Sequence, residues 1–234
     1  MKYFFSLSLV LFALSAHATL WITLSHPRSD KIAVVGASSG NIGDYKTMVS
    51  VDNHGIAVVG SWYLDRRQDH LKYLMRNETL TAREVAKEFS RLINLDSHKR
   101  RVSFVNDRFE NASEPGRGCH SDNYYCGKYE AEHFTITGGG LVSPEVINAG
   151  RVALENPRIQ TLPVECQLYL AMKAMFDAGI EFKTVNRLTF LIDDLRRERD
   201  NRIHLYFRKE SEQSLLDQFM AEVKSRGISC AQPI

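Results

Sequence analysis

Residues 19–40 read TLWITLSHPRSDKIAVVGASSG, and this stretch gives the clearest indication of the architecture. Two runs rich in β-branched and aromatic side chains, Thr19–Ser25 and Lys31–Ala37, flank a short segment that contains Pro27 and Asp30. Apolar runs of this length on either side of turn-forming residues predict a β-hairpin. We therefore expect an antiparallel pair of strands that begins at Thr19.

The residues before the hairpin have the pattern of an export signal. Lys2 precedes the apolar run Tyr3–Leu14, and Ala16-His17-Ala18 follows it. A charged start, an apolar core and an A-x-A site are typical of a cleaved signal peptide. The apolar run is well short of the roughly 20 residues that a membrane span needs, which disfavours an uncleaved anchor. We expect residues 1–18 to be removed and the exported protein, periplasmic or extracellular, to begin at Thr19.

Composition indicates one globular domain over residues 19–234. The chain is 44% hydrophobic and 25% charged, with a net charge of +2 that falls to +1 when Lys2 is lost with the signal. This near-neutral balance predicts no nucleic-acid partner. No later segment is long and apolar enough to cross a bilayer, so no membrane span is expected after processing.

The rest of the chain alternates between short apolar runs and amphipathic segments. Thr81 precedes an amphipathic stretch, 82–95, as a helix N-cap would. The polar residues 110–118, with Pro115 and two glycines, are predicted to form a loop. The further strands are expected at 47–51, 56–62, 101–105, 134–137, 187–192 and 203–207, and the further helices at 64–76, 144–155, 163–178 and 211–226. Paired strands joined by pairs of helices predict an α+β fold with helix-covered sheets.

Four cysteines remain in the expected exported chain: Cys119, Cys126, Cys166 and Cys230. An even number in an oxidising compartment favours disulfides, but four cysteines allow three pairings. A Cys119–Cys126 bridge would staple a loop, and a Cys166–Cys230 bridge would tie a helix to the C-terminal tail. The spacing of Cys119 and Cys126 is wider than that of common zinc pairs, so we predict no metal site.

Thr19 is the most informative candidate for chemistry. A threonine hydroxyl becomes nucleophilic when a base removes its proton, and the α-amine of an N-terminal threonine can be that base. The amine has a pKa of roughly 7.7–8.0, so a useful fraction is unprotonated near neutral pH. Signal cleavage would create this terminus here without self-processing. The alternative interpretation is that Thr19 only opens a strand.

The residues from Thr19 to Gly40 resemble the start of the family named domain of unknown function 1028 (DUF1028). Further similarities in the same order are Asn53–Gly60, Gly116–Cys119 and Thr137–Val146, and together they cover about residues 19–155. Members of that family look like N-terminal-nucleophile (Ntn) hydrolases. The resemblance implies a four-layer αββα sandwich with Thr19 at the end of a central strand.

The resemblance also implies roles for particular residues. Thr19 would be the nucleophile and its α-amine the base, with Ser38 and Ser39 supporting them. Backbone N–H groups of Gly138, Gly139 and Gly140 would stabilise an oxyanion, and Lys46 would lower the pKa of the amine. The implied reaction is hydrolysis of the C–N bond of a small amide or peptide, without a cofactor.

The sequence departs from the family pattern in two places. Many members have Gly-Asn before the helix that starts near Pro144, and this chain has only glycines there, which removes a side-chain oxyanion donor. Many also have a Gly-Asp-basic-Gly segment after the long helix, where this chain reads GIEFKTVNRL from Gly179. These differences affect the reaction that the resemblance implies more than the fold that it implies.

Three other interpretations follow from the sequence. One is a non-catalytic module on the same fold that binds peptidoglycan or peptides of the cell envelope. A second is an inactive enzyme that serves as a scaffold, and a homo-oligomer is compatible with either. The third, a dinucleotide site around Gly36–Gly43, fails because strands rather than a helix are expected after it.

Overall fold

A computed structural model describes residues 19–38, 48–51, 54–60, 68–92, 101–114, 125–180, 185, 187–196, 203–208 and 214–230. The predictions for residues 1–18, Ser39, Lys46 and Cys119 lie outside these ranges. No helix of the described residues is long and apolar enough to span a membrane.

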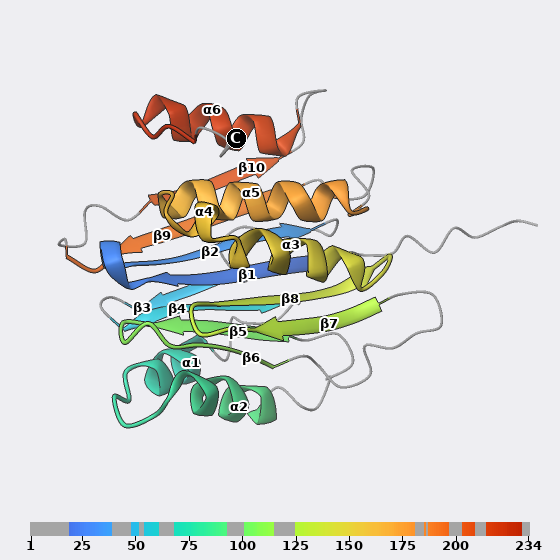
Figure 1. The fold of residues 1–234 in the computed structure, drawn as a ribbon. Coiled ribbons are helices and arrows are strands. Elements are labelled where there is room, and N and C mark those ends of the chain that lie inside the picture. Colours follow the sequence, from blue (N-terminus) through green and yellow to red (C-terminus); the bar gives the residue numbers. More distant parts are fainter. Residues whose placement is uncertain are drawn as a thin grey trace, which may run out of the picture.

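The predicted hairpin forms the centre of a six-stranded antiparallel sheet, in the strand order β10-β9-β2-β1-β8-β7 (Figure 1). Its strands are β1 Thr19–His26, β2 Lys31–Ser38, β7 Tyr125–Glu130, β8 Phe134–Leu141, β9 Arg187–Asp194 and β10 Ile203–Arg208. Pro27–Ser29 form a single 3-10 turn between β1 and β2, and Asp30 closes it with a left-handed backbone. The hairpin prediction is confirmed, with Thr19 opposite Ser38.

A second, four-stranded sheet has the order β3-β4-β5-β6. Its strands are β3 Met48–Val51, β4 Gly55–Gly60, β5 Arg101–Asn106 and β6 Asn111–Glu114. The prediction of a loop over residues 110–118 is wrong for Asn111–Glu114, which pair with β5. The strand forms despite its polar composition because its polar groups are used by the neighbouring sheet. The Asn111 amide donates to Ser25 Oγ at 2.7 Å, and the Ser113 N–H donates to the Glu130 carboxylate at 2.8 Å.

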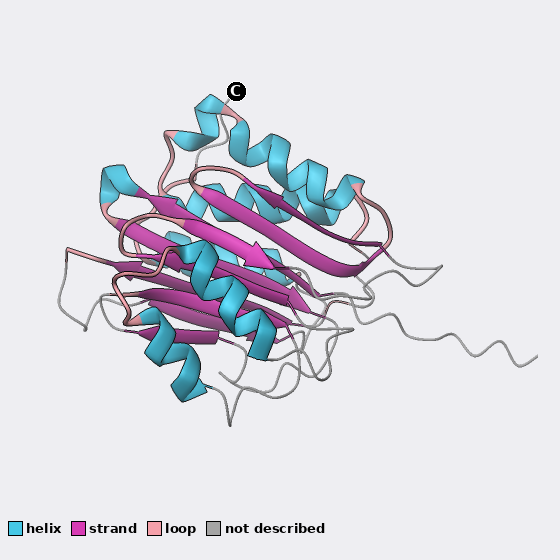
Figure 2. Cartoon of the chain, turned by 90° about the horizontal axis from the view of Figure 1, so that it is seen from below, coloured by secondary structure: helices cyan, strands magenta, loops and turns pink. Residues whose placement is uncertain are grey.

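The helices lie on the outer faces of the two sheets (Figures 1 and 2). Helices α3, α5 and α6 cover the six-stranded sheet, and helices α1 and α2 cover the four-stranded sheet. Their bounds are α1 Gln68–Met75, α2 Ala82–Leu92, α3 Glu145–Glu155, α4 Pro157–Gln160, α5 Val164–Asp177 and α6 Leu215–Ser225. Thr81 caps α2 reciprocally with Glu84, as a capping box does. The α+β class is confirmed.

The two faces of the six-stranded sheet differ in character. Leu20, Ile22 and Leu24 of β1 point into a large apolar core under α3, α5 and α6. Trp21, on the opposite face, belongs to a much smaller apolar cluster between the sheets. Because side chains alternate along a strand, Thr19 and Thr23 share the face of Trp21. The layer between the sheets is therefore rich in hydroxyl groups, and Thr23 Oγ1 is bonded there to Thr135 Oγ1 at 2.7 Å.

Trp21 occupies the space beside Gly36 on β2, directly opposite it in the hairpin. A Cβ atom at residue 36 would lie 1.9 Å from Cζ3 of the indole, which is itself only 1% exposed. A glycine is required here because the rigid ring is buried and cannot move aside. The flat indole thus covers the hairpin two residues from Thr19.

We expect Gly36→Ala to lower the free energy of unfolding by about 1–3 kcal/mol through overpacking. Chemical denaturation measures the loss directly. In a Trp21→Leu background the same substitution is expected to cost much less, because the ring that it strikes is gone. An equal loss in both backgrounds would contradict this packing.

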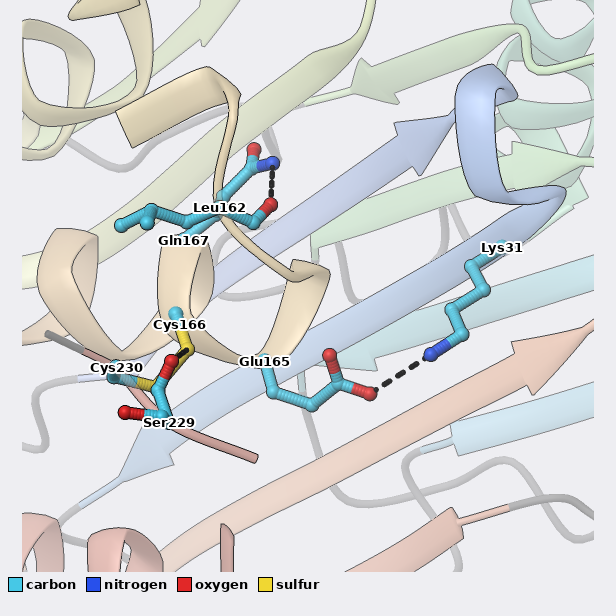
Figure 3. Close-up of a disulfide and its surroundings, with 7 residues drawn as sticks. All are labelled: Lys31, Leu162, Glu165, Cys166, Gln167, Ser229 and Cys230. Atoms are coloured by element: carbon cyan, nitrogen blue, oxygen red, sulfur yellow. Dashed lines mark hydrogen bonds and ion pairs between the residues drawn. A yellow bond between two sulfur atoms is a disulfide. The ribbon is translucent and has the colours of Figure 1, made fainter. Parts of the chain in front are cut away.

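At the other end of the hairpin, a disulfide joins Cys166 of α5 to Cys230 after α6 (Figure 3). Next to it, the buried Glu165 carboxylate forms an ion pair with Lys31 of β2, with Nζ and Oε1 3.1 Å apart. These bonds attach the helix layer to the sheet and the C-terminal tail to the helix layer.

Candidate functional site

A row of four residues crosses the six-stranded sheet where β1 begins. Thr19 is paired with Ser38 on one side and with Gly139 on the other, and Ser38 is paired in turn with Arg187. Residues directly opposite each other in antiparallel strands project their side chains from the same face. The hydroxyls of Thr19 and Ser38 and the guanidinium of Arg187 therefore share the face that looks toward the four-stranded sheet.

Thr19 and Ser38 are in contact through their hydroxyl oxygens, which lie 3.3 Å apart. Either oxygen can donate. Ser38 is 2% exposed, whereas Thr19 is half-buried, so the Thr19 hydroxyl is the more accessible of the two. The hairpin holds both side chains at adjacent strand ends. A buried hydroxyl beside an accessible one can orient it and share its proton.

The three glycines of β8 differ in their surroundings and in their backbone conformation. A Cβ at Gly138 would lie 2.7 Å from Leu141 and 3.0 Å from Leu20, so Gly138 serves packing under the helices. Gly139 is the residue next to Thr19. Gly140 has a positive φ of 68°, a conformation that favours glycine.

Gly139 and Gly140 also form a β-bulge. They lie together opposite Cys126, because the register with β7 shifts between Tyr125 and Gly127. A bulge leaves one residue out of the hydrogen-bond ladder and often occurs beside an active site. Here it lies in the strand adjacent to Thr19, and one of its two residues, Gly139, is paired with Thr19.

Thr137 adds a further polar group to the same face. It is paired with Trp21, two residues along β8 from Gly139, and is completely buried. Its Oγ1 and the indole Nε1 of Trp21 have no hydrogen-bond partner among the described residues. Buried polar atoms normally have partners, so these two fit a layer that receives water or a ligand.

Arg187 is the site residue that sequence reasoning missed. It is 8% exposed and opens β9, whose residues Leu188 and Phe190 point into the core under the helices. Strand periodicity alone places Arg187 on the other face together with Thr189 and Leu191. That signal was present in the sequence, but only the pairing of β9 with β2 reveals that the position adjoins Ser38.

Of the residues that the sequence analysis named, the structure places Thr19 between Ser38 of β2 and Gly139 of β8. Ser39 and Lys46 lie outside the described residues. Of the two disulfides considered, Cys166–Cys230 is present. Cys126 is also disulfide-bonded, and Cys119 lies outside the described residues. In the part of the chain that the structure describes, no three His, Cys, Asp or Glu side chains are grouped to hold a metal ion.

Comparison with solved structures identifies the fold. A protein from Silicibacter pomeroyi, described as belonging to the DUF1028 family, aligns with a TM-score of 0.73 over 91% of this chain and 90% of its own. The chain has the fold of a DUF1028 protein. Sequence identity over the alignment is 14%. No family model and no curated protein matches the chain by sequence.

Proposed function

We propose that this protein is a DUF1028 family member that acts as an exported N-terminal-nucleophile amidohydrolase. The observation that carries the proposal is the 3.3 Å contact between Thr19 and the buried Ser38, at the strand end beside Gly139. Residues 1–18 are the signal peptide in this proposal, and their removal exposes the α-amine of Thr19. In this proposal the two sheets and the helices on their outer faces are the four layers of an Ntn-type αββα sandwich.

The reaction begins when the α-amine takes the proton of the Thr19 hydroxyl, directly or through water. Oγ1 attacks the amide carbonyl carbon, and a C–O bond forms while the carbonyl oxygen becomes negative. When the C–N bond breaks, the amine gives its proton to the leaving nitrogen. Water then attacks the acyl-enzyme, which releases the acid and restores the Thr19 hydroxyl.

Two features support stabilisation of the intermediate. In this proposal a backbone N–H of the bulge at Gly139 and Gly140, in the strand paired with Thr19, binds the carbonyl oxygen that becomes negative. Such fixed dipoles stabilise an oxyanion strongly in a site that excludes water. Ser38, held by the hairpin, keeps the Thr19 hydroxyl in place. The first feature is a backbone group and the second is a side-chain hydroxyl, and the proposed reaction uses both without a cofactor.

Covalent labelling tests the mechanism without knowledge of the substrate. The protein beginning at Thr19 is incubated with a small acylating agent such as a β-lactone. Intact mass spectrometry is expected to show one adduct, and peptide mapping to place it on Thr19. N-terminal sequencing of the exported protein is expected to start at Thr19.

The alternative functions give other outcomes in the same experiment. Binding of peptidoglycan fragments without labelling of Thr19 would favour a non-catalytic module. Self-association with neither property would favour a scaffold. An exported protein that begins at any other residue would overturn the mechanism, because Thr19 would then have no free amine.

A further inference from the structure

We propose that the layer between the two sheets contains an internal water site, formed by Trp21 and Thr137 of the six-stranded sheet and by Ser103 of the four-stranded sheet. The inference goes beyond the proposed function and does not depend on it. It is carried by the position of these three residues, by their burial and by the hydrogen-bonding chemistry of their side chains.

Two of the three residues are neighbours in the six-stranded sheet. Trp21 of β1 is paired with Thr137 of β8, so both side chains project from the same face. Trp21 belongs to the apolar cluster between the sheets, and Thr137 therefore also faces the four-stranded sheet. Lys128 of β7 continues this row, because it is paired with Thr137. The row lies two residues along β1 from Thr19, a separation of roughly 7 Å.

Ser103 of β5 faces the same layer from the four-stranded sheet. Val105, two residues further along β5, belongs to the cluster between the sheets, and alternate residues of a strand share a face. Ser103 is paired with Ser113 of β6, whose carbonyl oxygen accepts a 2.9 Å hydrogen bond from Lys128 Nζ. Thr137 and Ser103 are each one strand further in than this contact, so their hydroxyls meet in the same part of the layer.

The three side chains are buried without hydrogen-bond partners. Trp21 and Ser103 are 1% exposed and Thr137 is 0% exposed. Among the described residues, no group bonds to Trp21 Nε1, Thr137 Oγ1 or Ser103 Oγ. Each buried polar group left without a partner costs free energy, and native proteins satisfy nearly all of them. In the same layer the hydroxyls of Thr23 and Thr135 satisfy each other, which shows the usual solution.

The chemistry of the three groups fits a water molecule. An indole N–H only donates, so the occupant must accept at least one hydrogen bond, whereas the two hydroxyls can donate or accept. Internal waters occupy polar sites that offer two to four partners, and they are small enough to be fully enclosed. The Lys128 ammonium is already paired with the Glu130 carboxylate at 3.3 Å, so its charge does not require an anion. A neutral water therefore bridges the two sheets near the Thr19 end of β1.

Thr137→Val tests the site, because valine has nearly the same shape but no hydroxyl. If Oγ1 binds an internal water, the substitution removes a hydrogen bond. We then expect the equilibrium constant of unfolding, measured by chemical denaturation, to increase about 5- to 10-fold. If Oγ1 has no partner, the substitution removes an unsatisfied group and that constant should fall.

The matched control is Thr135→Val, two residues away in β8 and in the same layer. Its hydroxyl bonds directly to Thr23 at 2.7 Å, so its loss is expected to increase the unfolding constant by a similar factor.

Ser103→Ala tests whether the two hydroxyls share one occupant. It is expected to destabilise the protein as Thr137→Val does. The Thr137→Val, Ser103→Ala double variant should then be destabilised by less than the two single effects combined, because both hydroxyls bind the same water. Circular dichroism on each variant verifies that it is folded.

Nuclear magnetic resonance detects the occupant directly. A nuclear Overhauser effect between the Trp21 indole N–H and water, with the negative sign of a long-lived contact, is expected in the unmutated protein. Thr137→Ser keeps the hydroxyl and should keep this signal, whereas the double variant should lose it. The chain has two tryptophans, and Trp62→Phe identifies the indole signal of Trp21.

Three results would overturn the site. They are a Thr137→Val protein as stable as the unmutated one or more stable, fully additive losses in the double variant, and an indole N–H without contact to water in the folded protein. None of these measurements involves turnover, so their failure leaves the proposed reaction at Thr19 unaffected, and failure of that reaction leaves the water site unaffected.

Discussion

Thr19→Ala is expected to lower the rate of amide hydrolysis at least about a thousand-fold, because it removes the atom that forms the acyl-enzyme. The loss is expected in kcat rather than in KM, since the other groups of the site remain. Folding should be nearly unchanged, because Thr19 is the half-buried first residue of β1 and its side chain has one weak contact. Turnover of a small acyl p-nitroanilide, followed by the absorbance of the nitroaniline released, and thermal melting of the same sample measure both effects.

Two matched variants distinguish the role of the Thr19 hydroxyl from that of its α-amine. Thr19→Ser keeps a hydroxyl and should retain measurable activity and acyl labelling. A protein with one additional residue before Thr19 keeps the hydroxyl but has no α-amine at that residue, and should be inactive. Undiminished hydrolysis by Thr19→Ala, or by the extended protein, would be incompatible with the proposed nucleophile and base.

Sequence patterns predicted those elements whose interacting residues are close together in the sequence. The hairpin follows from two β-rich runs and a turn between them, and its register places Thr19 opposite Ser38. The α2 helix follows from a stripe of apolar residues and from the pair Thr81 and Glu84. In both cases the interacting residues are close in the sequence, so the pattern contains nearly all the information that the structure uses.

The edge strands β6 and β7 were not predicted, because their stability comes from distant partners, whereas the edge strands β3 and β10 were predicted from their apolar runs. β6 is polar, and β7 contains Gly127 and Lys128, so neither has the alternation of a half-buried strand. Glu130 explains part of their pairing. Its burial opposes ionisation, but the Ser113 N–H and the Lys128 ammonium outweigh that effect and hold its pKa below the usual value. Such contacts cannot be inferred from one segment alone.

The candidate site also contains one contact that was predictable from nearby residues and one that depends on distant strands. The contact of Thr19 with Ser38 lies inside the hairpin and was accessible from the sequence. The contribution of Arg187 was not, because it depends on β9 pairing with β2 across most of the chain. Lys46 was named as the cation near the amine through the family resemblance, whereas the structure adds a buried cation, Arg187, in the strand next to Ser38.

The second large effect is expected at the Cys166–Cys230 disulfide, which closes a loop of 64 residues. By the chain-entropy model, a loop of this length stabilises the folded state by about 4 kcal/mol. For a domain of this size, each kcal/mol corresponds to roughly 2–4 °C in Tm, so Cys166→Ala with Cys230→Ala should lower Tm by about 8–16 °C. Calorimetric melting of the double variant and the unmutated protein measures the difference.

Unfolding of the double cysteine variant should begin at the C-terminal tail and not at Thr19. Ile228 and Cys230 pack on the core under the helices, and the ring of Phe219 of α6 packs at a tilt against Phe190 of β9, with ring centroids 4.5 Å apart. Without the disulfide, the described part of the tail is held by these apolar contacts and by the hydrogen bond from the Ile228 N–H to the Val223 carbonyl, so amide hydrogens of α6 should exchange faster. Ile228→Ala, which weakens packing but keeps the covalent bond, is the control and should shift Tm much less.

Below the new Tm the β1–β2 hairpin stays paired, so acyl labelling of Thr19 should persist. An unchanged Tm would show that packing alone secures the tail, and lost labelling of folded protein would show that the disulfide end and the Thr19 end are coupled.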